Sequence, residues 1–470
     1  MNEKEFIIKD FSEGLIDKID DNLLPENAAK DVQNWIGRYV GSLTKRNGQV
    51  RLNSTPLGGP ISGLYPYYVG STRRIIVSAN GVVAYWTGSA FVDLKTALNT
   101  TAPYFFETCI NYMVAFNGVD APWKWDGTTV SALANAPTDG QFPVLHKEKL
   151  FVVPKSTPST LKWSDSFAPE TWQGVNYWDV KKGDGDSITN LKKFLGELVI
   201  FKRRSIHSLR GTSLDDFRLD ENVTQIGCVG PNAATLSTLY VYFVSDEGLM
   251  AYNGLKVINI SQDRIPKLWA NINKQYIDKA AVGIWGKFIW FALPEGSSTY
   301  NNMVILYDPP ADGAAGGKFW SLRGINASCF MRYSDGTQEL FYAGDSNAGY
   351  VNQQDVGSDD FGSVINAYWV GKVFDMGSPE RDKRAKRVFV KDSPTTTNVV
   401  DLQISMDYGA FSSLNLRGTD RYVREFRFSS ANTRWRYLAP KLIHNALGPC
   451  EVRGILMPYK ARTRPKVRVV

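Results

Sequence analysis

Glycines that follow an aromatic residue by two positions recur at a regular interval in this sequence. The hairpin positions concerned are Trp86 with Gly88, Trp125 with Gly127, Tyr252 with Gly254, and Gly211, where Leu209 replaces the aromatic residue. Successive glycines lie 39, 84 and 43 residues apart, and because 84 is twice 42, one unit between them lacks its glycine. Gly349 follows Gly254 after 95 residues, which leaves room for two more units. Short strands repeated with this period are typical of radial β-architectures.

Seven units of about 42 residues fit between residues 56 and 362, and each contains about three apolar runs bounded by Gly, Asn, Asp or Pro. A single small sheet cannot bury both of its faces, whereas sheets packed around an axis bury both and keep only short edges. The sequence therefore predicts an all-β chain with a β-propeller of about seven (six to eight) blades. Two stacked β-sandwiches are the alternative. A strand from Gly41–Asn53 is the candidate to close the ring.

The stretch TLKWSDSFAPETWQ lies where the missing glycine is expected, about 42 residues from its neighbours. It resembles the Asp box loop of sialidase-like propellers, although Asp165 lies seven residues before Trp172 and the central glycine is absent. Asp165 and Glu170 beside two tryptophans also suggest a glycosidase pair, which needs two carboxylates across a cleft. We expect architecture instead: Trp163 and Trp172 pack across the blade, and Asp165 organises the loop by accepting backbone bonds.

The pattern changes after residue 362, where alternation becomes cleaner, as in RVFVKD and EVRGILMPY. This predicts a separate antiparallel β-domain over 363–470, after a propeller over 56–362 and an N-terminal arm over 1–55 that includes the closing strand. Two helices are also expected, over Pro25–Trp35 and Ile265–Ile277.

Positive charge concentrates in the C-terminal region. The chain has a net charge of +7, but residues 371–470 alone contain 20 Lys and Arg against 9 Asp and Glu. The basic residues proposed to contact a partner are Arg381, Lys383, Arg384, Lys386, Arg387, Arg462, Arg464, Lys466 and Arg468. A solvated face, contacts with DNA phosphates and docking on an acidic protein ring are all compatible with this charge.

No catalytic motif stands out, and the sequence is interpreted as that of a non-enzyme without cofactor or metal. Asp184 and Asp186 in KKGDGDSITN could hold Ca²⁺, but a third acidic ligand and a later Glu are missing, so a plain turn is expected. Cys109, Cys228, Cys329 and Cys450 are widely spaced and are expected to be buried, reduced thiols. Neither a secretory signal nor a membrane anchor is expected.

The two ends of the chain together resemble the tail hub or nozzle proteins of short-tailed bacteriophages, also called packaged-DNA stabilisation proteins. The matching features are Gly14-Leu15, Leu24-Pro25-Glu26-Asn27-Ala28, and Gly41-Ser42-Leu43 with Arg46 and Gly48. The segments FDMGSPERDKRAKRVFV and GILMPYKARTRPKVRVV resemble later parts of that family. The resemblance implies a propeller flanked by a platform that both chain ends build.

The same resemblance implies a role in the virion tail, after assembly in the host cytoplasm. The expected assembly is a homo-hexameric ring below the portal and adaptor proteins, which meets other tail proteins, retains the packaged DNA and conducts the double-stranded genome during ejection. The alternative function is a carbohydrate-binding or glycan-hydrolysing propeller associated with a phage tail. A third possibility is an intracellular scaffold propeller.

Overall fold

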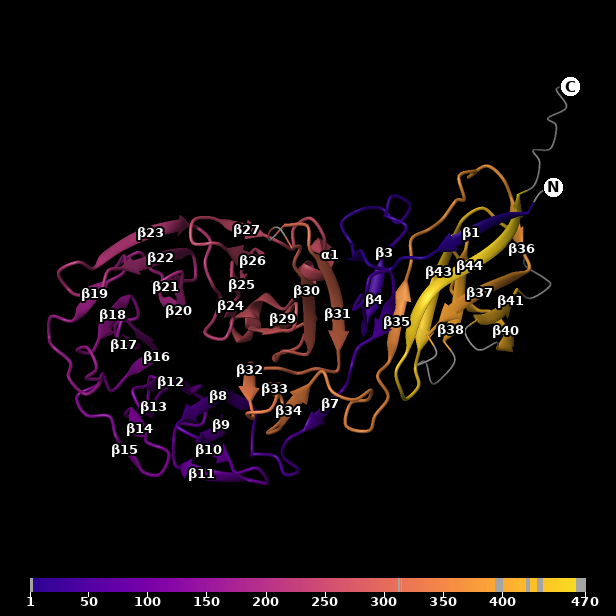
Figure 1. The fold of residues 1–470 in the computed structure, drawn as a ribbon. Coiled ribbons are helices and arrows are strands. Elements are labelled where there is room, and N and C mark those ends of the chain that lie inside the picture. The colour runs from indigo at the N-terminus through magenta and orange to yellow at the C-terminus, as the bar shows by residue number, and fades with distance from the viewer. Residues whose placement is uncertain are drawn as a thin grey trace, which may run out of the picture.

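The computed structural model describes residues 3–311, 313, 315–393, 400–419, 423–428 and 434–461. It consists almost entirely of antiparallel sheets, arranged as a ring of blades with a second unit at its side (Figure 1). The all-β propeller with a sandwich-like platform is therefore confirmed.

Seven four-stranded sheets form the blades of the propeller. Blades 1 to 3 contain β8 (Ile61–Val69), β9 (Thr72–Ala79), β10 (Val82–Trp86) and β11 (Phe91–Lys95); β12 (Phe105–Cys109), β13 (Tyr112–Phe116), β14 (Trp123–Trp125) and β15 (Val130–Ala132); and β16 (Gly140–His146), β17 (Lys149–Pro154), β18 (Thr160–Trp163) and β19 (Tyr177–Asp179). Blades 4 and 5 contain β20 (Ile188–Phe194), β21 (Glu197–Lys202), β22 (Ser205–Arg210) and β23 (Arg218–Thr224); and β24 (Ala234–Leu236), β25 (Val241–Ser245), β26 (Gly248–Tyr252) and β27 (Val257–Asn259). Blades 6 and 7 contain β28 (Ala281–Trp285), β29 (Phe288–Leu293), β30 (Met303–Asp308) and β31 (Lys318–Arg323); and β32 (Cys329–Ser334), β33 (Glu339–Gly344), β34 (Val351–Gln354) and β7 (Gln49–Arg51).

The first strands of successive blades contact one another in a closed ring, from β8 through β12, β16, β20, β24, β28 and β32 back to β8. Blade 7 takes its outer strand from the N-terminal region, since β7 pairs with β34 through Gln49 opposite Gln354. This closing strand lies inside the segment Gly41–Asn53 that the sequence indicated.

The middle strands of the blades are buried on both faces because neighbouring blades cover them. All five residues of β25 and all six of β29 are buried, and Ser245 at the end of β25 is the one residue of the two strands without an apolar or aromatic side chain. Outer strands such as Val130–Ala132 and Val257–Asn259 are short and more exposed, whereas β31 of blade 6 is buried where β2 (Gly14–Leu15), β4 (Asp31–Gln33) and β5 (Trp35–Ile36) cover it. Each unit thus has four strands rather than the predicted three, because exposed outer strands lack an apolar pattern that marks them in sequence.

The repeated glycines lie where predicted. Gly88, Gly127, Gly211 and Gly254 all have φ between 95° and 109° and connect the third strand of a blade to its fourth. Glycine adopts this left-handed conformation without steric cost. The aromatic residues before three of them, Trp86, Trp125 and Tyr252, end the third strands. Gly349 is different, because it precedes β34 and is not equivalent to the other four.

The helix predicted over Pro25–Trp35 is wrong. This segment contains β3 (Ala28–Ala29), β4 (Asp31–Gln33) and the start of β5 (Trp35–Ile36). Pairing of β4 with β35 (Ala367–Val370) overrides the local helical tendency, and Val32 and Trp35 are fully buried. The segment Ile265–Ile277 is partly helical, as α1 (Pro266–Ala270) and the 3₁₀ helix η1 (Lys274–Lys279).

The platform consists of two sheets that combine both ends of the chain. The larger has nine strands: β40 (Asn415–Thr419), β41 (Val423–Arg427), β37 (Arg387–Asp392), β44 (Glu451–Ala461), β36 (Lys383–Ala385), β42 (Arg434–Trp435), β1 (Lys4–Ile8), β5 and β6 (Leu43–Lys45). The smaller contains β39 (Ser412–Ser413), β38 (Asp401–Met406), β43 (Leu438–His444), β35 and β4. Buried residues of both sheets, such as Val390 and Leu442, belong to one apolar core. A short parallel pair, β2 (Gly14–Leu15) with β3, completes the strands.

The N-terminal arm joins the platform to the propeller at β31, the outer strand of blade 6. The amide of Asn34 donates to the carbonyl of Ser321 at 2.9 Å, and the Asn34 side chain accepts from the amide of Arg323 at 2.9 Å. Arg46, whose side chain is 3% exposed, donates to the Arg323 carbonyl at 3.0 Å and through two nitrogens to Asp360 at 2.9 and 2.5 Å. The two units are therefore fixed by buried polar contacts as well as by apolar packing.

Candidate functional site

A group of basic side chains covers the outer face of the large platform sheet. Its members, called the basic ladder below, are Arg384, Arg387, Lys391, Arg427, Arg434 and Lys460. Strand alternation puts them there: the residues that flank them in β36, β37 and β44, such as Ala385, Val388 and Tyr459, point into the core. All six are exposed.

The register of the sheet sets like charges opposite one another. Arg384 stands opposite Arg434 on β42 and opposite Lys460 on β44, and Arg387 stands opposite Arg427 on β41. Opposed like charges destabilise a sheet. Glu425 compensates Arg427, with 2.9 Å between Oε1 and Nε, but the other five ladder residues have no ion pair within the described part of the chain. The platform thus presents excess positive charge that an acidic surface or a phosphate chain would neutralise.

The residues predicted to contact a partner separate into three groups. Arg384 and Arg387 belong to the ladder, and Lys386 is exposed between them. Arg381 lies before β36, where its Nε is 3.2 Å from Glu380. The predicted tail residues Arg462, Arg464, Lys466 and Arg468 lie outside the described residues.

Lys383 does not belong to this surface, which corrects the prediction. Its side chain is buried and donates to the carbonyls of Ser378 at 2.6 Å and Arg436 at 2.9 Å, with the Trp435 ring 5.8 Å away. It lies next to Arg384 in β36, so strand alternation turns it inward. Sequence reasoning missed Lys391, Arg427 and Arg434, which the alternation in RVFVKD, REFRF and RWRY could have identified.

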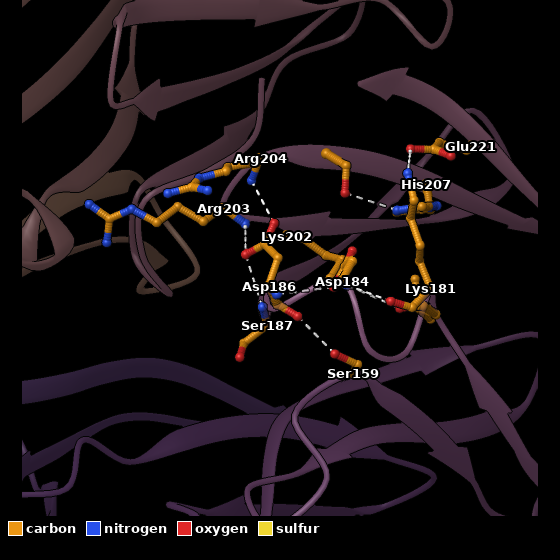
Figure 2. A network of polar contacts seen from close by, with 12 residues as sticks. Ser159, Lys181, Asp184, Asp186, Ser187, Lys202, Arg203, Arg204, His207 and Glu221 are labelled. Carbon is orange, nitrogen blue, oxygen red and sulfur yellow. Dashed lines mark hydrogen bonds and ion pairs between the residues drawn. The ribbon is translucent and has the colours of Figure 1, made fainter. Parts of the chain in front are cut away.

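The loop with Asp184 and Asp186 holds an internal cation (Figure 2). The ammonium of Lys202, which has no exposed side-chain surface, lies 2.7 Å from both oxygens of Asp184 and 3.1 Å from the Val180 carbonyl. Burial opposes ionisation of Asp184, but the hydrogen bonds from Lys202 and the Asp186 amide outweigh it and lower the pKa of that carboxyl. Lys202 thus occupies the position at which the loop could offer carboxylates to Ca²⁺.

Asp186 instead fastens the loop to the next hairpin. Its carboxylate accepts from the amides of Arg203 at 3.2 Å and Arg204 at 2.8 Å (Figure 2). Nearby, Lys181 pairs with Glu221 at 2.6 Å, and burial lowers the pKa of His207. Among the described residues there is no cluster of three or more His, Cys, Asp and Glu side chains able to hold a metal.

The stretch around Asp165 is the connection between β18 and β19, the place where other blades have a tight glycine turn. Trp163 is buried and contacts Phe151 and Phe217 in the core between blades 3 and 4, with ring centroids 5.6 and 5.3 Å away. Trp172 packs on the opposite side, against the cluster between blades 2 and 3. The two tryptophans therefore hold the two faces of one blade.

Both carboxylates of this stretch bind within the blades. Asp165 supports the loop through side chains instead of the predicted backbone amides: within the described residues, its carboxylate accepts from the side chains of Asn176 and Gln173, each at 2.9 Å. Glu170 pairs with Lys124 at 2.5 Å and accepts from the Ala134 amide at 3.0 Å, and these contacts lower the pKa of its carboxyl. A glycosidase acid needs a raised pKa, so this pair has the opposite electrostatics.

A cavity of about 530 Å³ lies on the propeller axis. All seven first strands contribute to its wall. Its charged lining residues are Glu107, Lys192, Lys193 and Arg332, and its aromatic ones include Tyr65, Phe106, Phe142 and Phe330.

No protein-family model matches the chain. No curated protein matches it either. Among solved structures, the computationally designed Ika8 protein aligns at 11% identity and a TM-score of 0.40, over 66% of this chain and 100% of the other. The AfRom2 CNH domain aligns at 10% identity and a TM-score of 0.41, over 66% and 99%. The extracellular domain described as part of a hybrid two-component system of B. thetaiotaomicron aligns at 8% identity and 0.48, over 82% of this chain and 48% of that one.

The four cysteines are buried, as expected from their spacing. Within the described residues, the helices are too short and too polar to cross a membrane.

Proposed function

We propose that this chain is a structural subunit of a bacteriophage tail, the hub or nozzle ring that retains the packaged genome and forms its exit conduit. The observation that carries the proposal is the basic ladder, a broad exposed surface whose like charges stand in opposition and require a partner to neutralise them. In a ring, that partner is an acidic surface on a neighbouring subunit or tail protein.

The residues that resemble the tail family support the proposal by their location. Gly14 lies against β31, where an added Cβ would meet the Phe319 carbonyl at 2.6 Å. Gly48 lies against the blade 7 connection, where a Cβ would meet the Asp359 carbonyl at 1.7 Å. Arg46 is the buried link between the same parts. These residues therefore fix the platform to the propeller, so the resemblance concerns the architecture itself.

The size of the axial cavity determines where a conduit would lie. A volume of about 530 Å³ corresponds to a small-molecule pocket. A sphere of that volume is only about 10 Å across, less than the width of about 12 Å of the DNA major groove alone. Duplex DNA would thus pass between several copies of the chain arranged in a ring, and contact each copy from outside its propeller.

The test is charge reversal on the ladder, with Arg384→Glu and Arg387→Glu combined in phage particles. Lys256→Glu, on an exposed propeller turn, is the matched control. Electron microscopy should show a sixfold ring on the portal axis with the wild-type and control chains, and particles without that ring with the double variant. Assembled particles that leak DNA would assign the ladder to phosphates instead of a protein neighbour. Normal particles that retain DNA would overturn the role of the ladder, and a monomer that hydrolyses polysaccharide would overturn the tail function.

A further inference from the structure

The axial cavity of the propeller has the features of a binding site. Each of the seven first strands is the end strand of its sheet, so one backbone edge of each remains without a sheet partner. Such an edge presents N–H and C=O groups to whatever lies beside it. The cavity, at about 530 Å³, falls within the range of about 300–1,000 Å³ typical of small-molecule pockets.

The charges on the cavity wall are unequally matched. Glu107 has Lys193 Nζ 3.9 Å from its Oε2 and accepts from the amide of Leu145 at 3.2 Å. Arg332 pairs with Glu339 on the neighbouring strand. Two of the three cations on the cavity wall, Lys193 and Arg332, are therefore in ion pairs.

Lys192 is the third cation, and it differs from the other two. Its ammonium has no hydrogen bond or ion pair within the described part of the chain, although the side chain is only partly accessible. Burial lowers its pKa, and the charge of Glu107 on the same wall opposes that shift only in part. A partly desolvated charge without a partner is costly, and an anion placed beside it would remove that cost.

The rest of the wall is aromatic. Phe106 lies 6.0 Å from Tyr65, and Phe330 stacks on Phe341 at 5.3 Å, so the rings on this wall are held in place by packing. The hydroxyl of Tyr65 is hydrogen-bonded to the hydroxyl of Thr108 at 2.8 Å, and Tyr65 lines the cavity. Fixed aromatic faces favour a flat apolar body with a few polar groups that set its orientation.

We propose that the axial cavity binds a small organic anion, with an aromatic body between the rings of the wall and a carboxylate or phosphate on the ammonium of Lys192. Charge selects the anion, and the rings select its body. This binding is independent of the role proposed for the platform, because the ladder and the cavity share no residue.

The experiment is calorimetric titration of the full chain with phenyl phosphate, benzoate, inorganic phosphate and benzyl alcohol. We expect one site per chain for the two aromatic anions, and binding at least about tenfold weaker for inorganic phosphate and for the neutral alcohol. Equal binding of inorganic phosphate, or of the alcohol, would overturn the assignment. Failure of both aromatic anions to bind would overturn it too.

Three variants identify the site. Lys192→Met should weaken phenyl phosphate binding at least about tenfold, whereas Lys192→Arg should retain it within about threefold. Lys256→Met, on the exposed turn after Gly254, is the control and should bind as the wild type does. Thermal unfolding verifies that each variant is folded. Unchanged binding by folded Lys192→Met would refute the proposal, and so would equal loss in Lys192→Met and Lys256→Met.

Discussion

In the propeller, Lys202 has no exposed side-chain surface and lies 2.7 Å from both carboxylate oxygens of Asp184. On the platform, by contrast, Arg387 of β37 stands opposite Arg427 of the neighbouring strand β41, and both side chains are exposed to solvent. Both regions are antiparallel sheet, and both contain many basic residues. The propeller pairs several of its cations, among them Lys124, Lys202 and Arg203, with carboxylates in its own loops. Among the described residues, five of the six ladder cations of the platform have no ion pair, and all six are exposed.

This contrast separates side chains that hold the fold from side chains available to a partner. In the propeller, loop carboxylates such as Asp165, Glu170 and Asp186 accept hydrogen bonds from neighbouring segments. In the platform, apolar packing between the two sheets supplies stability, and the ladder residues on the outer face are exposed. Substitutions in the two regions should therefore differ in both size and sign.

The largest effect is expected at the blade interface. Trp163→Ala should lower the free energy of unfolding by about 3–5 kcal/mol, because it leaves a cavity between Phe151 and Phe217. Urea unfolding measures this change. Trp172→Ala, on the other face of the blade, is the control; its half-buried ring should cost clearly less. Equal losses would contradict the unequal burial of the two tryptophans.

Arg46→Ala tests whether the two regions unfold together. Removing this buried guanidinium leaves Asp360 and the Arg323 carbonyl without their partner, at a cost of about 3 kcal/mol. Calorimetry should show one transition in the wild type and two in the variant, one for each region. Arg332→Ala, which removes an exposed pair, should cost less than about 1 kcal/mol and keep a single transition.

Asp184→Asn should lower the free energy of unfolding near neutral pH by about 2 kcal/mol, because Lys202 loses a charged acceptor. The folded-state pKa of Asp184 is lowered, so its contribution is complete above the ordinary Asp pKa of about 3.9 and is lost as the pH falls below it. Urea unfolding of both chains at several pH values should show a difference that shrinks in acid. A difference independent of pH would exclude the ion pair as its source.

Asp165→Ala should cost about 1 kcal/mol, because the loop loses two hydrogen bonds to one partly exposed carboxylate. Asp93→Ala, at an exposed position of β11, is the matched control and should stay within about 0.5 kcal/mol. Urea unfolding again provides the measurement. A loss of stability no larger than that of the control would show that the hydrogen bonds of Asp165 do not stabilise the loop.

The smallest effect carries the opposite sign. Arg387→Glu should raise the free energy of unfolding of the isolated chain by about 0.2–1 kcal/mol at low salt, because it turns a repulsive cross-strand pair with Arg427 into an attractive one. High salt should screen the gain. Arg210→Glu in the propeller should instead destabilise, since Arg210 lies 2.7 Å from Glu197. If Arg387→Glu and Arg210→Glu changed the free energy of unfolding in the same direction, the proposed difference between the two regions would be wrong.

The periodic glycines were enough to predict the propeller, because the left-handed turn between the third and fourth strands contains a glycine at the same place in four of the seven blades. The missing glycine also located the long loop of blade 3. The outer strands were not predicted, since exposed segments such as Val257–Asn259 carry no apolar alternation. The segment Pro25–Trp35 misled because its partner, β35, lies more than 300 residues away.

The candidate surface was predicted only in part. The charge pattern identified the basic run that contains Arg384 and Arg387. It did not show that the side chain of Lys383 turns into the core and donates to the Ser378 carbonyl. Strand register, which determines that Arg384 meets both Arg434 and Lys460, depends on pairings across the whole platform. The axial cavity could not be foreseen either, because residues such as Lys192 and Phe330 meet only when the ring is closed.

The closing strand also determines how long the ring stays open during biosynthesis. Gln49 of β7 and Gln354 of β34, which share a side-chain hydrogen bond at 3.0 Å, are separated by 305 positions. A ribosome that adds about 5–20 residues per second therefore needs roughly 15–60 s to supply the partner of a strand made near the beginning. During that interval, six blades can stack while the ring stays open. If β34 of a nascent chain paired first with β7 of another molecule, the two molecules would exchange strands. Closure within one chain therefore prevents domain swapping of the newly made protein.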